Sequence, residues 1–388
     1  MIISLRRGVL ILAGGVLALA AIALPVQAAS SPRAAAATGG WRVVKTISER
    51  GRSISLLGID AVSRSDAWVD GFIEPARAKL PLVALIEHWN GSVWRRAAVP
   101  AKAAATLTVG DRFPFAVSAS SAANVWVFSI GRAYLHLTAT GWHTGSLPKG
   151  LAGSSSILDA KVFGPSDVWV FGDGNVTAIS ASKLTSFAAH FNGRRWSASR
   201  MPTRGGAGPV SALSEDDMWA ITGQGLYARH ASGPRVARWN GKSWQLTAAQ
   251  PSLPRAAMLY SILALSNRDV WVAGSAPNPR NGSSPFAEHW NGRVWQDVSP
   301  PAAATSGDVV LTFLVPDGSG GIRATSTDIS SARSTLWHYA RGVWTAVRAP
   351  GSWPDPELAA VPHSTSTWAI SGFLQGRGLI LLHGPIPR

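Results

Sequence analysis

The sequence predicts an all-β protein, a seven-bladed β-propeller of four-stranded antiparallel blades. Three observations lead to this prediction. A segment of the form His-Trp-Asn-Gly ending in Trp recurs, as in HWNGSVW at 88–94 and HWNGRVW at 289–295. The last Trp of each copy returns every 48 to 54 residues, which is a propeller period. A second landmark, a Trp inside a short apolar segment such as SDAWVDG at 65–71, falls between successive copies.

Two Trp positions define the repeat. Both are interpreted as scaffold, and the Trp of the second landmark is expected to pack between adjacent blades. The Trp that closes each copy stands at Trp41, Trp94, Trp142, Trp196, Trp244, Trp295 and Trp344. The Trp of the second landmark stands at Trp68, Trp126, Trp169, Trp219, Trp271 and Trp368. In the remaining copy, GGIRATS at 320–326, Ile322 takes the place of this Trp.

Each copy reads as four strands. In the first copy they are expected at 54–63, 67–72, 82–89 and 92–99, where apolar residues alternate or cluster. Asn90-Gly91 predicts a two-residue hairpin with positive φ at both positions. A proline such as Pro100 ends the fourth strand because it cannot donate to a ladder. No helical periodicity is found after residue 28, so no helix is expected in the propeller.

The two ends of the chain are predicted to complete one blade together. LILLHG at 379–384 reads as a third strand with no hairpin after it, and the segment that contains Trp41 reads as a fourth strand with no third strand before it. Pairing them closes the ring at a seventh blade and removes open sheet edges.

The N-terminus has the pattern of a secretory signal peptide over residues 1–28. Arg6 and Arg7 precede an apolar run, and Val26 and Ala28 offer small residues for cleavage. A flexible Ala/Ser-rich segment (29–40) and the propeller (41–388) follow, and the mature chain is expected to be extracellular. An uncleaved anchor is the alternative, and no later stretch is apolar enough to span a membrane.

The mature chain is strongly basic and has no cysteine. Loss of Arg6 and Arg7 from 36 basic residues, against 21 acidic residues, gives a net charge of +13. The basic residues are scattered, which indicates general attraction to polyanions and no specific nucleic-acid partner. Disulfides are excluded, so packing has to supply the stability.

The order of motifs resembles that of kelch-type propellers, which include the central domain of galactose-oxidase-like proteins. DVWVFG (167–172), AAHFNG (188–193), RRW (194–196) and RMPTRG (200–205) follow the family order, and the resemblance covers residues 41–388. The family's glycine doublet is mostly a single Gly here. The copper oxidase chemistry of one branch needs a Tyr–Cys crosslink, which a chain without cysteine cannot form.

The repeated polar residues are also interpreted as scaffold. Histidines recur in one slot, at His88, His136, His190, His289, His338 and His383, with Arg238 in the remaining blade. Since these positions lie on different blades, they cannot converge on one metal, and neither a metal nor a cofactor is expected. Asp66, Asp167, Asp217 and Asp269 precede a repeat Trp by two residues and are expected to cap backbone amides at turns.

Function is therefore expected on the long, irregular connections, which lie on the face opposite the short turns. The predicted ligand-binding residues on these connections are Arg77, Lys79, Arg112, Asp173, Arg229, Arg255, Tyr260, Arg280, Arg333, Trp353 and Arg377. Arg and aromatic side chains suit an anionic or hydroxyl-rich ligand. The prediction is a secreted, monomeric, non-catalytic module that binds a glycan, a cell-envelope polymer or a protein.

Two alternatives stay open. A carbohydrate-active hydrolase or lyase would need acids that break the repeat, and the candidates are Asp60, Asp111, Asp159, Asp173 and His230. A structural subunit of a surface assembly is the other alternative. No catalytic residue is assigned.

Overall fold

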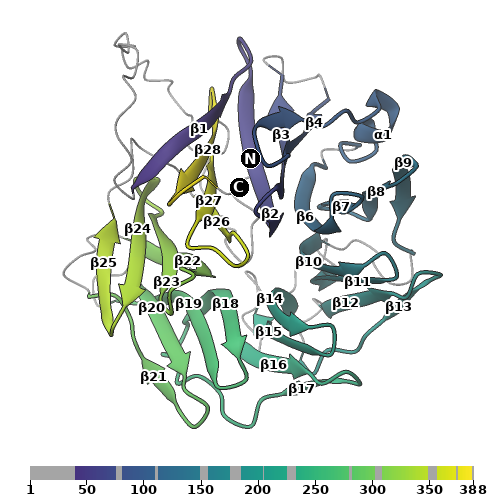
Figure 1. The fold of residues 1–388 in the computed structure, drawn as a ribbon. Helices are drawn as coiled ribbons and strands as arrows, with labels where there is room; N and C mark the ends of the chain where they lie inside the picture. The colour runs from purple at the N-terminus through teal and green to yellow at the C-terminus, as the bar shows by residue number, and fades with distance from the viewer. Residues whose placement is uncertain are drawn as a thin grey trace, which may run out of the picture.

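The computed structural model shows a ring of seven four-stranded sheets around a central axis (Figure 1). It describes residues 40–75, 81–109, 112–148, 156–174, 185–203, 205–224, 233–278, 282–301, 308–347, 356–372 and 375–386. The signal peptide and most of the 29–40 segment lie outside these ranges. Neighbouring strands are antiparallel within every sheet, so the protein is a seven-bladed β-propeller, as predicted.

The strands of each blade follow one another from the axis to the rim. The first four blades are β2 (Ser53–Ser63), β3 (Asp66–Glu74), β4 (Val83–Trp89) and β5 (Trp94–Arg96); β6 (Pro114–Ser121), β7 (Asn124–Ser129), β8 (Ala133–Thr138) and β9 (Gly141–Ser146); β10 (Ser156–Gly164), β11 (Asp167–Gly174), β12 (Thr185–Phe191) and β13 (Trp196–Ala198); and β14 (Gly206–Ser214), β15 (Asp217–Gln224), β16 (Arg235–Trp239) and β17 (Trp244–Leu246).

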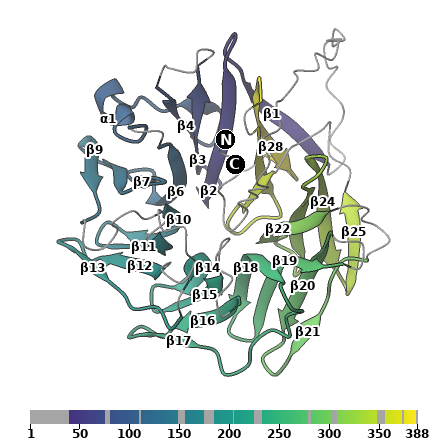
Figure 2. The same cartoon turned by 180° about the vertical axis from the view of Figure 1, so that it is seen from behind.

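The other three blades complete the ring. They are β18 (Met258–Ser266), β19 (Asp269–Pro277), β20 (Ser283–Trp290) and β21 (Trp295–Asp297); β22 (Val309–Pro316), β23 (Ile322–Asp328), β24 (Arg333–Ala340) and β25 (Val343–Val347); and β26 (Glu357–Ala360), β27 (Thr367–Ser371) and β28 (Gly378–His383) with β1 (Trp41–Ile47). Blades 1 to 7 are numbered in this order. Viewed from behind, β1 again lies beside β28 (Figure 2).

Blade 7 confirms the predicted closure. β1 pairs with β28 from Trp41 opposite His383 to Ile47 opposite Gly378. The closing strand is also tied to blade 1, because Lys45 Nζ lies 2.6 Å from Glu87 Oε2. The ring is thus closed by a ladder and by an ion pair whose carboxylate is buried.

Two local predictions were wrong. A short helix, α1 (Ala101–Ala105), follows Pro100, where the sequence AKAAA combines strong helix formers over a stretch too short to show a period. The hairpin at Asn90 is not a two-residue turn, since Trp89 pairs with Trp94 and only Gly91 has positive φ. The Asn90 side-chain oxygen accepts hydrogen bonds from the backbone amides of Ser92 and Val93. Asn192, Asn240 and Asn291 do the same in their blades.

The single glycine of the second strand has a packing reason. At Gly71 an added Cβ would lie 2.0 Å from the Ser55 carbonyl oxygen, and at Gly274 it would lie 1.8 Å from that of Met258. Both contacts fall next to a register shift between the first and second strands. The bulge therefore brings the inner strand onto the backbone of its neighbour, where no side chain fits.

The Trp pairs pack between blades, as predicted. The second-strand Trp of one blade meets the closing Trp of the next edge to face, with ring centroids 6.2 Å apart for Trp68 and Trp142 and 6.0 Å apart for Trp126 and Trp196. Trp368 meets Trp94 across the closure at 5.1 Å. Each of these contacts joins the apolar cores of two blades, which explains the number of Trp residues.

Candidate functional site

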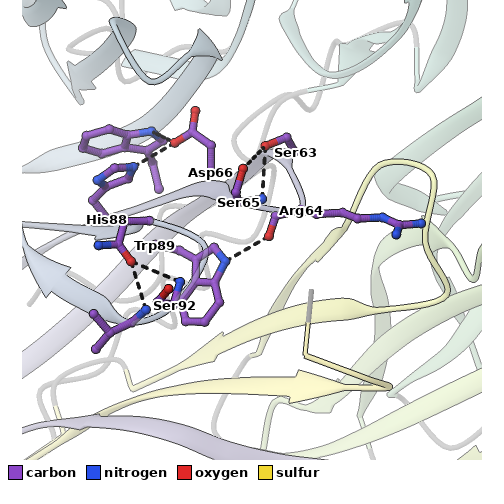
Figure 3. Close-up of polar contacts among 10 residues, drawn as sticks. Ser63, Arg64, Ser65, Asp66, His88, Trp89 and Ser92 are labelled. Atoms are coloured by element: carbon purple, nitrogen blue, oxygen red, sulfur yellow. Dashed lines mark hydrogen bonds and ion pairs between the residues drawn. The ribbon is translucent and has the colours of Figure 1, made fainter. Parts of the chain in front are cut away.

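The repeated Asp, His and Trp of a blade form one hydrogen-bonded cluster (Figure 3). In blade 1, Asp66 Oδ1 accepts a hydrogen bond from Trp68 Nε1 at 2.8 Å and lies 2.9 Å from His88 Nε2. The His88 ring stacks on Trp68 with centroids 3.9 Å apart. The partners of Asp66 are these side chains and not the backbone amides that we expected.

The cluster recurs around the ring with substitutions that keep its geometry. Asp167 and Asp269 bind His190 and His289 in the same way. In blade 2 the acceptor is Asn124, and in blade 4 Arg238 replaces the histidine and binds Asp217 with two nitrogens at 2.7 and 2.8 Å. Each cluster stays within its own blade. The signal for it was present in the sequence as an Asp two residues before one Trp and a His six residues before the other.

Two repeat assignments in blades 6 and 7 need correction. In blade 6, Arg323 lies opposite His338 and occupies the slot of the second-strand Trp, whereas Ile322 lies one position earlier. In blade 7, His383 pairs with Trp41, as Trp89 pairs with Trp94, so His383 occupies the Trp89 slot and not the histidine slot. Leu382 is the residue opposite Trp368. Blades 6 and 7 are therefore where the repeat breaks.

The acids proposed for catalysis near the axis tie neighbouring blades together. Asp60 Oδ2 accepts the amide of Ala119 in blade 2 at 2.8 Å, and Asp159 Oδ2 accepts the amide of Val210 in blade 4 at 2.8 Å. Burial raises the pKa of Asp60, and its hydrogen bond from Ala119 opposes the rise. Lys161 Nζ lies 3.0 Å from Asp159.

These acids share a small cavity on the axis. It has a volume of about 90 Å³, and Asp60, Asp159, Lys161 and Glu357 contribute the charged groups of its lining. Ligand pockets usually begin at roughly 300 Å³. The cavity is too small for a sugar ring together with its approach path.

Asp173 is the remaining described candidate acid. It lies at the end of β11 beside Gly206 of blade 4, on the long-connection face. Burial raises its pKa to about 7, and a hydrogen bond from the Ala207 amide limits the rise. Asp111 and His230 lie outside the described residues.

The other predicted binding residues do not form one described site. Arg112, Arg255, Arg333 and Arg377 are exposed, whereas Tyr260 is buried. Within the described part of the chain, no hydrogen bond or ion pair joins any two members of this set. The remaining five, Arg77, Lys79, Arg229, Arg280 and Trp353, lie outside the described residues. A site on the long-connection face therefore stays a prediction.

A cavity of about 710 Å³ lies on the opposite face, where the short turns of blades 1, 6 and 7 meet. We call it the seam cavity. Its lining consists of Arg64, Pro316, Gly318, Ala360, Val361, Pro362, His363, Ser364, Thr365, Ser366, Pro385 and Ile386. The volume falls within the usual range of roughly 300–1,000 Å³ for ligand pockets. Nothing in the sequence repeat marks these residues, since they come together only when the ring closes.

The turn and the chain end that line the seam cavity are held by hydrogen bonds. Arg64 reaches from the blade 1 turn toward the C-terminal blade (Figure 3), where its Nη2 donates to the His363 carbonyl at 2.5 Å. His363 has a φ of 53°, a left-handed conformation that costs about 1 kcal/mol outside glycine. Ser366, which stands in the slot of the repeat Asp, donates to the Pro385 carbonyl at 2.8 Å.

A buried positive charge lies next to the turns that line the seam cavity. Arg323 is 8% exposed and donates to the Asp317 carbonyl and to Thr367 Oγ1 of blade 7. Asp317 is the acid of this region. Burial acts to raise the pKa of its carboxyl, but hydrogen bonds from His338, Ser319 and Gly321 outweigh this effect and hold the pKa below its usual range. Burial, together with the charges of Arg323, His338 and Arg42, lowers the pKa of His383 to about 4.

Comparison with known proteins supports the fold. No protein-family model matches the chain, and no curated protein sequence matches it. Among solved structures it is similar to YCF48 bound to D1 peptide (TM-score 0.56, 13% identity, 90% of this chain and 99% of that one). YCF48 from Cyanidioschyzon merolae gives a TM-score of 0.56 at 14% identity, over 89% of this chain and 99% of that chain. The WD40 propeller domain of Doa1 gives 0.51 at 9% identity, over 89% and 97%.

At these identities the likeness shows a propeller and nothing finer. The kelch subtype suggested by the order of the motifs stays a prediction. Within the described residues, no helix is long and apolar enough to cross a membrane.

Proposed function

We propose that this chain is an exported, monomeric, non-catalytic binding module whose partner is a segment of another protein. The observation that carries the proposal is the contrast between the axial cavity and the seam cavity, both formed by described residues. The acids on the axis hold blades together around about 90 Å³, whereas the seam cavity offers about 710 Å³ and no carboxylate in its lining. Propeller scaffolds present such blade-specific surfaces on a rigid frame.

A protein partner suits the seam cavity better than a glycan does. Its lining is rich in Pro, Val, Ala and Ile and contains no Trp, Tyr or Phe. Sugar recognition usually employs an aromatic face, and none of the Trp side chains in the described part of the chain is exposed. The similar YCF48 structure was solved with a bound peptide, which is consistent with this use of the fold.

A second candidate, binding to an anionic cell-envelope polymer or glycan, is favoured by the charge of the mature chain. A net charge of +13 attracts polyanions without a specific site, and salt screens this attraction over about 10 Å at 0.1 M. The two candidates therefore differ in how their binding depends on salt.

The test is binding of residues 29–388 to panels of peptides, glycans and heparin at 0.05 M and 0.5 M salt. We expect salt-resistant binding to a subset of peptides. Binding to every polyanion that disappears in high salt would leave only the electrostatic candidate. Turnover of a panel glycan that Asp60→Asn and Asp159→Asn abolish, in variants that remain folded, would overturn the non-catalytic proposal.

A further inference from the structure

The break in the repeat lies next to the seam cavity, and one of its residues, Ser366, is part of the lining. Arg323 replaces a Trp at the contact between blades 6 and 7, Ser366 of blade 7 replaces an Asp, and Leu382 replaces a His in the core that blade 7 shares with blade 1. In a repeat protein, positions that depart from a rule that the other copies obey are candidates for function. The departures remove an aromatic contact between blades and place a guanidinium there.

The charges around the seam cavity favour an anion. Arg64 and His363 are the ionisable residues of its lining, and Arg42 donates to the Gly384 carbonyl beside it at 2.6 Å. Arg323 lies beneath the lining, and the Asp317 carboxylate is already engaged by its own turn. A guanidinium has five N–H donors, and the Arg64 side chain is exposed with one described hydrogen bond.

The rest of the lining favours an apolar chain. Val361, Pro362, Pro316, Pro385 and Ile386 surround the space next to Arg64, and Ile386 is 48% exposed. An exposed apolar side chain beside other apolar groups gains about 25 cal/mol for each Å² that a partner covers. An occupant therefore needs a small apolar body and one carboxylate.

We propose that the seam cavity binds the C-terminal end of a partner polypeptide, with its apolar last residues against Pro362 and Ile386 and its terminal carboxylate on Arg64. This inference rests on the proposed function and names the site and the chemistry of the partner. An extended chain end fits a cavity that is open at the turn face. Arg binds a carboxylate with two parallel N–H donors, which fixes direction as well as charge.

The test compares two probes on the folded chain, residues 29–388. Both are N-acetylated peptides of four apolar residues, one with a free C-terminal carboxylate and one with a C-terminal amide. Isothermal titration at 0.15 M salt is expected to show about tenfold tighter binding of the acid, the effect of one charge-assisted contact. Equal binding of both peptides, or binding of neither, would overturn the inference.

Variants locate the site. Arg64→Gln is expected to abolish the preference for the acid, while Arg64→Lys retains part of it. Arg268→Gln is the matched control, because Arg268 is exposed in the equivalent turn of blade 5 and lines no part of the seam cavity. Thr365→Trp fills the cavity from an exposed position and is expected to block both peptides. If Arg64→Gln keeps the tenfold preference while remaining folded, the site is elsewhere, and peptide-panel binding would still support the proposed function.

Discussion

Replacing Asp66 by Ala removes the acceptor at the centre of the blade 1 cluster. Trp68 is 3% exposed, so its indole N–H would be left buried without the partner that now lies 2.8 Å away. That loss costs about 1–3 kcal/mol. The His88 side chain is 26% exposed and can turn to water, which adds about 1 kcal/mol. The expected decrease in the free energy of unfolding is therefore about 2–4 kcal/mol.

Two comparison variants make this prediction specific. Asp66→Asn keeps an oxygen acceptor, as Asn124 does in blade 2, and is expected to cost about 1 kcal/mol or less. Asp269→Ala removes the same acceptor in blade 5, where the carboxylate side chain is 42% exposed, and is expected to cost about half as much as Asp66→Ala.

Guanidinium chloride unfolding, followed by Trp fluorescence, measures the three differences at constant m value. The reasoning is refuted if Asp66→Ala lies within about 0.5 kcal/mol of the unsubstituted chain, the usual range for surface changes. It is also refuted if Asn and Ala at position 66 are equally destabilising.

Three further predictions concern packing, pH and closure. Gly274→Ala places a Cβ 1.8 Å from the Met258 carbonyl oxygen and is expected to cost about 2–3 kcal/mol, whereas Gly164→Ala, with open space around it, is expected to be neutral in the same unfolding assay. The pKa of Asp173 is raised from 3.8 to about 7, so the folded state holds a proton that the unfolded state has lost between these values, and stability falls as pH rises through this window. Asp173→Asn should flatten that dependence and stabilise the fold at pH 8 by up to about 4 kcal/mol. Melting curves of the variant and of the unsubstituted chain at pH 5 and 8 check this, and an equal change in melting temperature between the two pH values for both chains would contradict it. Removing residues 29–47 opens blade 7 and is expected to give a chain that aggregates and melts without a cooperative transition, while a soluble, cooperative product would show that β1 is dispensable.

The fold could be predicted from the sequence because one structural unit is repeated seven times along the chain. The Trp spacing fixes the period, and the split between Trp41 and the 379–384 strand fixes the closure. The errors arise where a copy departs from the pattern. The blade 6 turn from Asp317 to Gly321 is longer than the turn between Ser63 and Asp66 in blade 1, and no Trp follows it to mark the slot, so the sequence reasoning assigned Ile322 to a slot that Arg323 occupies.

The candidate site was much less predictable. The sequence reasoning assigned Asp66 to backbone amides because a short acid at a turn does that in general, and its partner His88 lies 22 residues away across the sheet. The seam cavity is assembled from turns of blades 1, 6 and 7 and from the chain end, which are up to about 320 residues apart. No local sequence pattern predicts such a site, although Ser366 in its lining stands in a slot where blades 1 to 5 carry Asp or Asn.

The central claim is that a partner binds where the repeat breaks, at the seam of blades 6, 7 and 1. Amide hydrogen exchange of residues 29–388, with and without the tightest peptide ligand from the panel, tests it most directly. The account predicts slower exchange in 360–366 and 316–318, with the equivalent turns of blades 2 to 5 unchanged. Slower exchange confined to the long connections on the opposite face would contradict it.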